Sequence, residues 1–254
     1  MKKIILLSSL LALSIPSIAC ESSPVKVLVV GDSQTGATWA KSYFGNFLHE
    51  CLGEDFMIFG KGGSILSSWL GKGGLDNIQI IQRDPENKQL NLGLGDQVPL
   101  CKKRFAPMLD TFSPQKFMLF FGDNYIASTD EQIILETNKT LDLLQEKGIS
   151  SESCFFLTPT FEMEVATKRN VTRKNYENTL RISNAIKKAS EGRCTILDGL
   201  EIMENSPYYL SNKLLKRVHV PGNNDCAGSA SNDNIHICGE AARDLAEKVC
   251  QKLR

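Results

Sequence analysis

The sequence predicts an α/β protein whose parallel sheet is covered by helices on both faces. Short apolar runs, rich in β-branched and aromatic residues, alternate along the chain with longer amphipathic stretches. The short runs have the length of buried strands, and the amphipathic stretches have the length of helices. Strands that alternate with helices are joined by right-handed crossovers and lie parallel in one sheet. At 254 residues the chain is long enough to bury one large core of this kind.

The predicted elements follow one another regularly until one segment interrupts them. The predicted strands are 25–30, 56–59, 116–121, 153–157 and 194–197. The predicted helices are 37–51, 129–147, 176–190 and 240–252. Residues 71–114, with their Gly, Asn, Asp and Pro, predict a long loop or small insertion over the edge of the sheet. Since no linker or repeat divides the remainder, we expect a single domain over residues 20–254.

The balance of charges and the spacing of key residues exclude several classes of ligand. The 29 basic and 29 acidic side chains cancel, so we expect no nucleic-acid partner held by bulk electrostatics. The pairs Gly60-Lys61 and Gly71-Lys72 lack the spacing of a phosphate-binding loop. The cysteines show no CxxC spacing, which argues against zinc. We therefore expect no cofactor and no metal.

Residues 1–19 have the pattern of a bacterial-type secretory signal peptide. Lys2 and Lys3 form a short basic start, residues 4–15 are mostly apolar, and residues 16–19 are mostly small. The apolar run is too short to span a bilayer as a mature helix. The chain also has 8 cysteines, an even number that can pair fully in an oxidising compartment. We expect the mature protein to be periplasmic or secreted.

Cys20 stands at the predicted cleavage point and admits a second interpretation. A lipoprotein signal would lipidate this cysteine, but such signals usually carry an aliphatic residue three positions earlier, where this chain has Ser17. Ser17 and Ala19 suit ordinary cleavage after small residues better, and lipidation would leave an odd thiol. We favour an unanchored protein, and we expect membrane contact only if Cys20 is lipidated.

The turns that follow the predicted strands hold the candidate site, because open parallel sheets bind ligands at the carboxyl ends of their strands. The first turn, residues 31–36, places Ser33 directly after a strand and directly before a helix. At such a helix start, free backbone N–H groups lie beside an activated hydroxyl and a developing oxyanion. The alternative is that Asp32, Ser33 or Thr35 is only an N-cap.

Asp233 and His236 lie just before the last predicted helix. A serine nucleophile needs a base that works near pH 7 and a third group that fixes the tautomer of that base. His236 is one of only 3 histidines, and an aspartate three positions earlier can hold its ring. An Asp-x-x-His pair alone is common and mostly accidental. Combined with Ser33, it predicts a Ser-His-Asp triad.

Two further turns carry candidate oxyanion donors. Asn124 follows the strand 116–121, and its side-chain amide can donate a hydrogen bond. Gly60, Gly62 and Gly63 follow the strand 56–59 and offer backbone N–H groups. The alternative is that all four residues only form turns, because glycine adopts positive φ at little cost and asparagine is common in turns.

The order of these features resembles the SGNH hydrolase superfamily, also called GDSL-type esterases. Gly-Asp-Ser follows the first strand, a glycine turn follows the second, Gly-x-Asn follows the third, and Asp-x-x-His precedes the last helix. This ordered set spans nearly the whole chain after residue 20. The resemblance implies a three-layer α/β/α sandwich, a flavodoxin-like parallel sheet of about five strands, and metal-free hydrolysis of carboxylic esters.

The resemblance also implies a role for each residue of the predicted triad. Ser33 is similar to the family's nucleophile, and its own backbone N–H is similar to one oxyanion donor. His236 matches the general base, and Asp233 matches the residue that orients it.

For the rest of the oxyanion hole, the resemblance implies that Asn124 donates through its side chain and that one glycine donates through its backbone. Among the glycines we favour Gly63, with Gly62 next and Gly60 still open. One departure stands beside Asn124, because the family often has aspartate where this chain has Tyr125. This departure removes no catalytic group, so it bears on the substrate more than on the chemistry.

The substrate class is predicted from the residues around the glycine turn and from the interrupting segment. Gly62-Gly63-Ser64 with Trp69 nearby resembles a pattern of carbohydrate-acting relatives, and the polar segment 71–114 shows no apolar acyl channel. We therefore expect an esterase that removes O-acetyl groups from a carbohydrate or envelope polysaccharide. The alternatives are a lipolytic esterase or lysophospholipase, and a catalytically silent module that binds glycan or protein.

Cys226 and Cys238 bracket the predicted Asp233 and His236 in a segment with little apolar content. Such a polar loop loses backbone entropy on ordering and gains little burial in return. We expect a Cys226–Cys238 disulfide that constrains this loop. Pairing of either cysteine elsewhere, or two buried free thiols, are the alternatives.

Overall fold

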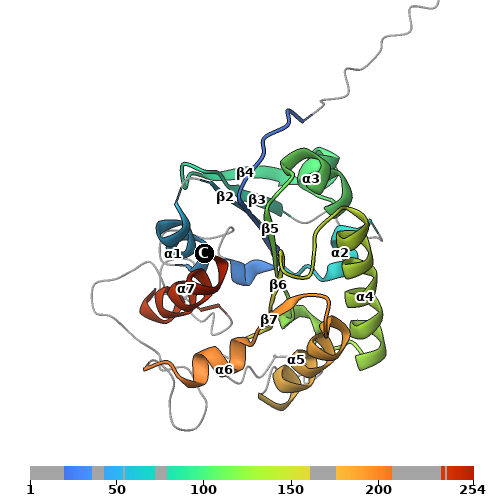
Figure 1. Ribbon diagram of the computed structural model, residues 1–254, viewed down its shortest axis with the longest axis vertical. Helices are drawn as coiled ribbons and strands as arrows, with labels where there is room; N and C mark the ends of the chain where they lie inside the picture. Colours follow the sequence, from blue (N-terminus) through green and yellow to red (C-terminus); the bar gives the residue numbers. More distant parts are fainter. Residues whose placement is uncertain are drawn as a thin grey trace, which may run out of the picture.

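The structure of the protein is a computed structural model of three layers, with a sheet between two layers of helices (Figure 1). It describes residues 20–35, 43–53, 55–71, 79–160, 176–207, 236–237 and 239–254. The predicted signal peptide, residues 1–19, lies outside this range. The arrangement confirms the predicted α/β class.

The sheet has seven strands in the order β4-β3-β2-β1-β5-β6-β7. Five of them run parallel and correspond to the five predicted apolar runs: β1 (Val27–Gly31), β2 (Phe56–Lys61), β5 (Lys116–Phe120), β6 (Cys154–Leu157) and β7 (Thr195–Leu197). Counted along the chain, these five parallel strands have the flavodoxin-like order 2-1-3-4-5.

The interrupting segment adds an antiparallel hairpin to the sheet where a long loop or small insertion was expected. β3 (Gln79–Arg83) pairs with β2, and β4 (Gln89–Leu94) pairs with β3 at the edge. The leucines of β4 alternate with Gln, Asn and Gly, the pattern of a strand that is apolar on one face only. Such a strand has no continuous apolar run. The short helix η2 (Leu100–Lys102) and α3 (Phe105–Phe112) complete the segment.

The helices divide between the two faces of the sheet, as Figure 1 shows with the sheet nearly edge-on. One layer contains α2 (Leu66–Leu70), α3, α4 (Asp130–Glu146) and α5 (Tyr176–Ser190). The other contains α1 (Phe44–Leu52), α6 (Gly199–Glu204) and α7 (Gly239–Leu253). Along β1, Leu28 and Val30 pack against the first layer, while Val27 and Val29 pack against the second. This alternation buries β1 on both faces.

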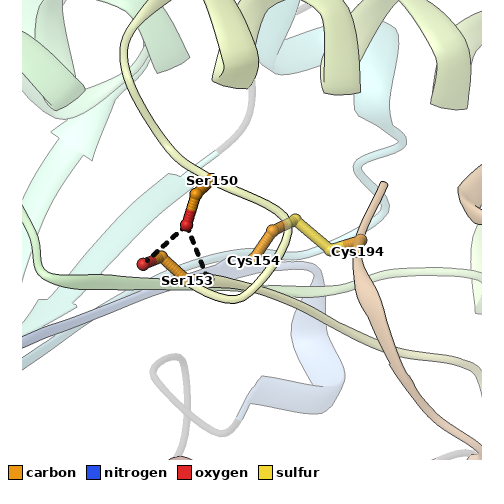
Figure 2. The surroundings of a disulfide bond; sticks show 4 residues. All are labelled: Ser150, Ser153, Cys154 and Cys194. Carbon is orange, nitrogen blue, oxygen red and sulfur yellow. Dashed lines mark hydrogen bonds between the residues drawn. A yellow bond between two sulfur atoms is a disulfide. The ribbon is translucent and has the colours of Figure 1, made fainter. Parts of the chain in front are cut away.

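Three disulfides join the described cysteines: Cys20–Cys101, Cys51–Cys250 and Cys154–Cys194. Figure 2 shows the third, which links the beginning of β6 to the residue before β7, beside a turn in which the Ser150 hydroxyl accepts the N–H of Ser153 at 3.3 Å.

The predicted Cys226–Cys238 pair lies outside the described residues. Within the described ranges, no helix has the length and hydropathy of a membrane span.

Candidate active site

Three turns from distant parts of the chain meet at the carboxyl edge of the sheet. β1 lies between β2 and β5 and runs parallel to both, and Gly31 at its end is in register with Gly60 and with Phe120. The turns that follow these three strands are therefore neighbours. They carry three residues of the predicted site, Ser33, Gly63 and Asn124.

Ser33 begins the short helix η1 (Ser33–Thr35) and is partly buried. Asp32, not Ser33, caps this turn, because the Asp32 carboxylate accepts the backbone N–H of Gln34 at 2.9 Å. The Thr35 hydroxyl donates to the Asp32 carbonyl at 2.9 Å. The capping alternative therefore applies to Asp32. No hydrogen bond joins the Ser33 hydroxyl to another group of the described residues, His236 included.

Asn124 connects the three turns. It lies in η3 (Asp123–Tyr125), directly after β5. Its Nδ2 is 3.0 Å from the carbonyl oxygen of Ser64 and 3.3 Å from Oδ2 of Asp32. Because an amide nitrogen has two hydrogens, one can stay on Ser64 while the other is donated to a charge that develops beside the Ser33 turn. The predicted donor therefore points toward the predicted nucleophile turn.

The three candidate glycines differ in their position and exposure. Gly60 is a buried residue of β2, in register with Gly31 on one side and Ile81 on the other. Gly62 and Gly63 lie in the turn itself, and Gly63 has φ 69°. That left-handed conformation favours glycine, and a Cβ at Gly63 would meet no atom within 4 Å. Gly63 is thus an exposed backbone position facing open space.

Trp69, a buried side chain that the sequence pattern did not identify as a support, holds this glycine turn through Ser64, the residue after Gly63. Trp69 is fully buried, donates its indole N–H to Oγ of Ser64 at 3.2 Å, and stacks on Phe105. Ser64 in turn accepts Asn124 through its carbonyl. Trp69 therefore supports the turn that carries the candidate oxyanion donor Gly63 and offers no exposed ring to a substrate.

Tyr125 supports the next turn of the chain. Its hydroxyl accepts the backbone N–H of Leu66 at 3.1 Å and donates to Oε2 of Glu136 at 2.6 Å, and Glu136 also accepts the N–H of Ser67 at 3.2 Å. These bonds satisfy N–H groups at the beginning of α2. Burial, reinforced by the bond to Glu136, raises the pKa of the Tyr125 phenol above its ordinary value.

His236 is described and partly buried, whereas Asp233 lies outside the described residues. The residue after the histidine, Ile237, donates its backbone N–H to Oε1 of Gln34 at 3.2 Å. Gln34 directly follows Ser33. The chain neighbours of the predicted base and nucleophile are therefore in contact, although the two side chains do not hydrogen bond.

Comparison with known proteins gives matches at the level of structure. No protein-family model and no curated protein matches the sequence. A GDSL-like lipase from Bacteroides thetaiotaomicron matches with a TM-score of 0.55 and 13% identity, over 91% of this chain and 91% of the other. A carbohydrate acetylesterase from Sinorhizobium meliloti matches with a TM-score of 0.50 and 13% identity, over 90% of this chain and 97% of the other. An aryl esterase from M. smegmatis matches with a TM-score of 0.50 and 13% identity, over 91% of this chain and 98% of the other.

These matches extend over most of the chain, and all three proteins are named as ester hydrolases or lipases. At such low identity the matches establish the fold alone, and the reaction has to be argued from the residues of the site. The protein has the fold of the SGNH, or GDSL-type, hydrolases.

Proposed function

We propose that the protein is a serine esterase that hydrolyses carboxylic esters at the edge where β1, β2 and β5 end. The observation that supports this most is the placement of Asn124, whose amide bridges Ser64 and Asp32 beside Ser33. A nucleophile turn, a glycine turn and an asparagine donor that converge in this way are the parts that an acyl-transfer site requires.

In the proposed mechanism, Oγ of Ser33 attacks the ester carbonyl and its proton passes to His236. Asp233 holds the imidazole in the productive tautomer. The negative oxygen of the tetrahedral intermediate accepts the N–H groups of Ser33 and Gly63 and the amide of Asn124. His236 then protonates the leaving alcohol, and water hydrolyses the acyl-enzyme by the same steps. The hydrogen bond between a catalytic serine and its histidine often tightens only in the complex with substrate.

We further propose O-acetyl groups on a carbohydrate as the substrate. A carbohydrate acetylesterase is among the proteins with this fold. A lipolytic esterase is the second candidate, because a GDSL-like lipase matches over a similar share of the chain. A silent binding module is disfavoured by the intact set of site residues.

We propose a periplasmic or secreted location without a lipid anchor. Three disulfides favour an oxidising compartment. The Cys20–Cys101 bond also occupies the sulfur that a lipid anchor would need.

The test compares three substrates with one purified protein lacking residues 1–19. These are p-nitrophenyl acetate, p-nitrophenyl palmitate and an acetylated polysaccharide, each also given to the S33A variant. We expect acetate release from the short ester and the polysaccharide, and none with S33A. A preference for the palmitate would replace the carbohydrate assignment with the lipolytic one, and the absence of hydrolysis of all three would favour the silent module.

A further inference from the structure

We propose that Gln34 is a positioning residue that fixes the segment carrying the general base against the nucleophile turn and the asparagine turn. This inference rests on the proposed function, since it assigns Gln34 a task within the same site. Gln34 directly follows Ser33 in η1, and its side chain is buried with 3% of the residue exposed.

The two ends of the Gln34 amide have partners of opposite kind. Its Nε2 donates to the Asp123 carboxylate, and its Oε1 accepts the backbone N–H of Ile237 at 3.2 Å. A carboxylate only accepts hydrogen bonds and a backbone N–H only donates them. The amide therefore has one orientation that satisfies both partners, and rotating it by half a turn would break both bonds.

Each contact of this amide lies one residue from a predicted site residue. Gln34 is next to Ser33, Asp123 is next to Asn124, and Ile237 is next to His236. The bonds span 89 and 203 residues of sequence, so they join elements that no local structure brings together. A single side chain thus fixes the relative positions of the nucleophile, one oxyanion donor and the base.

The backbone at Gln34 is itself held in place. Asp32 accepts the Gln34 N–H, and the N–H of Asp32 donates to the carbonyl of Phe120 in the neighbouring strand at 3.2 Å. On the other side of the amide, Ile237 is buried with 3% exposed and packs in the core beneath α7. The Gln34 backbone is therefore fixed to the sheet, and Ile237 is fixed in the core. Because both ends are held, the Gln34 amide can keep the two segments at a constant distance from each other.

The substitution Gln34→Glu separates this role from simple packing, because it changes almost no volume. The new carboxylate still accepts the Ile237 N–H, but it faces Asp123 with no hydrogen to donate and with a like charge. We expect kcat to fall by roughly 100-fold, the scale of a 1 Å misplacement of reacting groups, with KM little changed. If Gln34 only filled space, this variant would behave like the wild type.

The second substitution, Asp123→Asn, exchanges the donor and the acceptor of the hydrogen bond when it is combined with Gln34→Glu. In Q34E/D123N the asparagine amide donates to the new glutamate, so one donor again lies between the two side chains and the Ile237 N–H keeps its acceptor. We expect the double variant to recover to within about tenfold of the wild type. D123N alone keeps an oxygen that accepts from Gln34, so it should lose less than about tenfold.

The control carries the same chemical change at a distant position. Gln115 is exposed and lies just before β5, at the opposite edge of the sheet from the site. Q115E should keep the wild-type kcat. Thermal melting of every variant, with assays run well below each midpoint, separates loss of positioning from loss of folded protein.

The outcomes decide the proposal in every case. A large loss in Q34E with recovery in Q34E/D123N supports it, as does a Q34E protein that folds only when D123N is added. Unchanged kcat in Q34E, or a double variant no better than Q34E, overturns it. S33A separates the proposed function from the proposed role of Gln34. If S33A is inactive while Q34E is normal, only the role of Gln34 fails. An active S33A overturns the proposed function and the role of Gln34 with it.

Discussion

Tyr125 and Glu136 form a buried hydrogen bond of 2.6 Å that joins the turn after β5 to the middle of α4. Both side chains also satisfy N–H groups of the first turn of α2, which directly follows the glycine turn. Tyr125 thus supports the segment that directly follows the turn of the candidate oxyanion glycine.

The substitution Tyr125→Phe should destabilise the fold by about 1–3 kcal/mol, because it leaves the buried Leu66 N–H without its acceptor and removes one hydrogen-bond donor from the Glu136 carboxylate. Urea unfolding measures this free energy. Tyr176→Phe is the matched control, since Tyr176 makes the same kind of bond to Glu204 at the surface. It should cost less than about 1 kcal/mol. Equal losses in the two variants would show that burial of the Tyr125 bond contributes nothing.

The raised pKa of Tyr125 predicts a loss of stability in alkali. In the unfolded chain this phenol titrates near its ordinary pKa of about 10, whereas the folded protein keeps it protonated. Its contribution is therefore fully present below about pH 10 and decreases as the pH rises further, by up to about 1.4 kcal/mol per pH unit. The free energy of unfolding should fall less steeply above pH 10 in Tyr125→Phe than in the wild type. Parallel curves for both proteins would contradict the assignment.

The substitution Asn124→Ala should lower kcat by about 100- to 1,000-fold, the usual effect of removing one oxyanion donor, with a small change in KM. Steady-state kinetics on p-nitrophenyl acetate measures both constants. Asn205→Ala is the control, because the side-chain amide of this asparagine donates to the Glu201 carbonyl at a surface helix end. A wild-type rate in Asn124→Ala would reduce Asn124 to a turn residue.

The elements that the sequence predicted best are those whose pattern is local. The five apolar runs became the parallel strands, and the predicted helix 176–190 coincides with α5. The hairpin was missed because β4 lies at the sheet edge and is apolar on one face only. The glycine and asparagine turns could be placed because parallel strands bring their ends together. The roles of Gln34 and Tyr125 could not be predicted, because their hydrogen-bond partners are distant in sequence and come near only in the folded chain.

The Cys20–Cys101 disulfide predicts that the mature protein carries no lipid at its first cysteine. Peptide mapping of the exported protein without reduction should yield a peptide that joins Cys20 to Cys101, and radiolabelled palmitate should not be incorporated. A lipidated N-terminal peptide would contradict the bond and establish the anchored alternative.

The disulfide between Cys226 and Cys238 stays a prediction. Three described bonds use six of the 8 cysteines, and these two are the remainder. Closing a loop of this size is worth about 3 kcal/mol in the chain-entropy model. The same peptide map should contain a Cys226–Cys238 peptide. Either cysteine joined to another partner, or both found free, would remove the constraint on the histidine segment.

The central claim is that Ser33 is an activated nucleophile, and covalent trapping tests it most directly. The purified protein is incubated with a serine-directed fluorophosphonate, and intact mass spectrometry and peptide mapping follow. We predict the addition of one phosphonyl group per chain, located on Ser33, absent in S33A and strongly slowed in H236A. An adduct on another residue, or an esterase-active protein that stays unlabelled, would contradict the assignment.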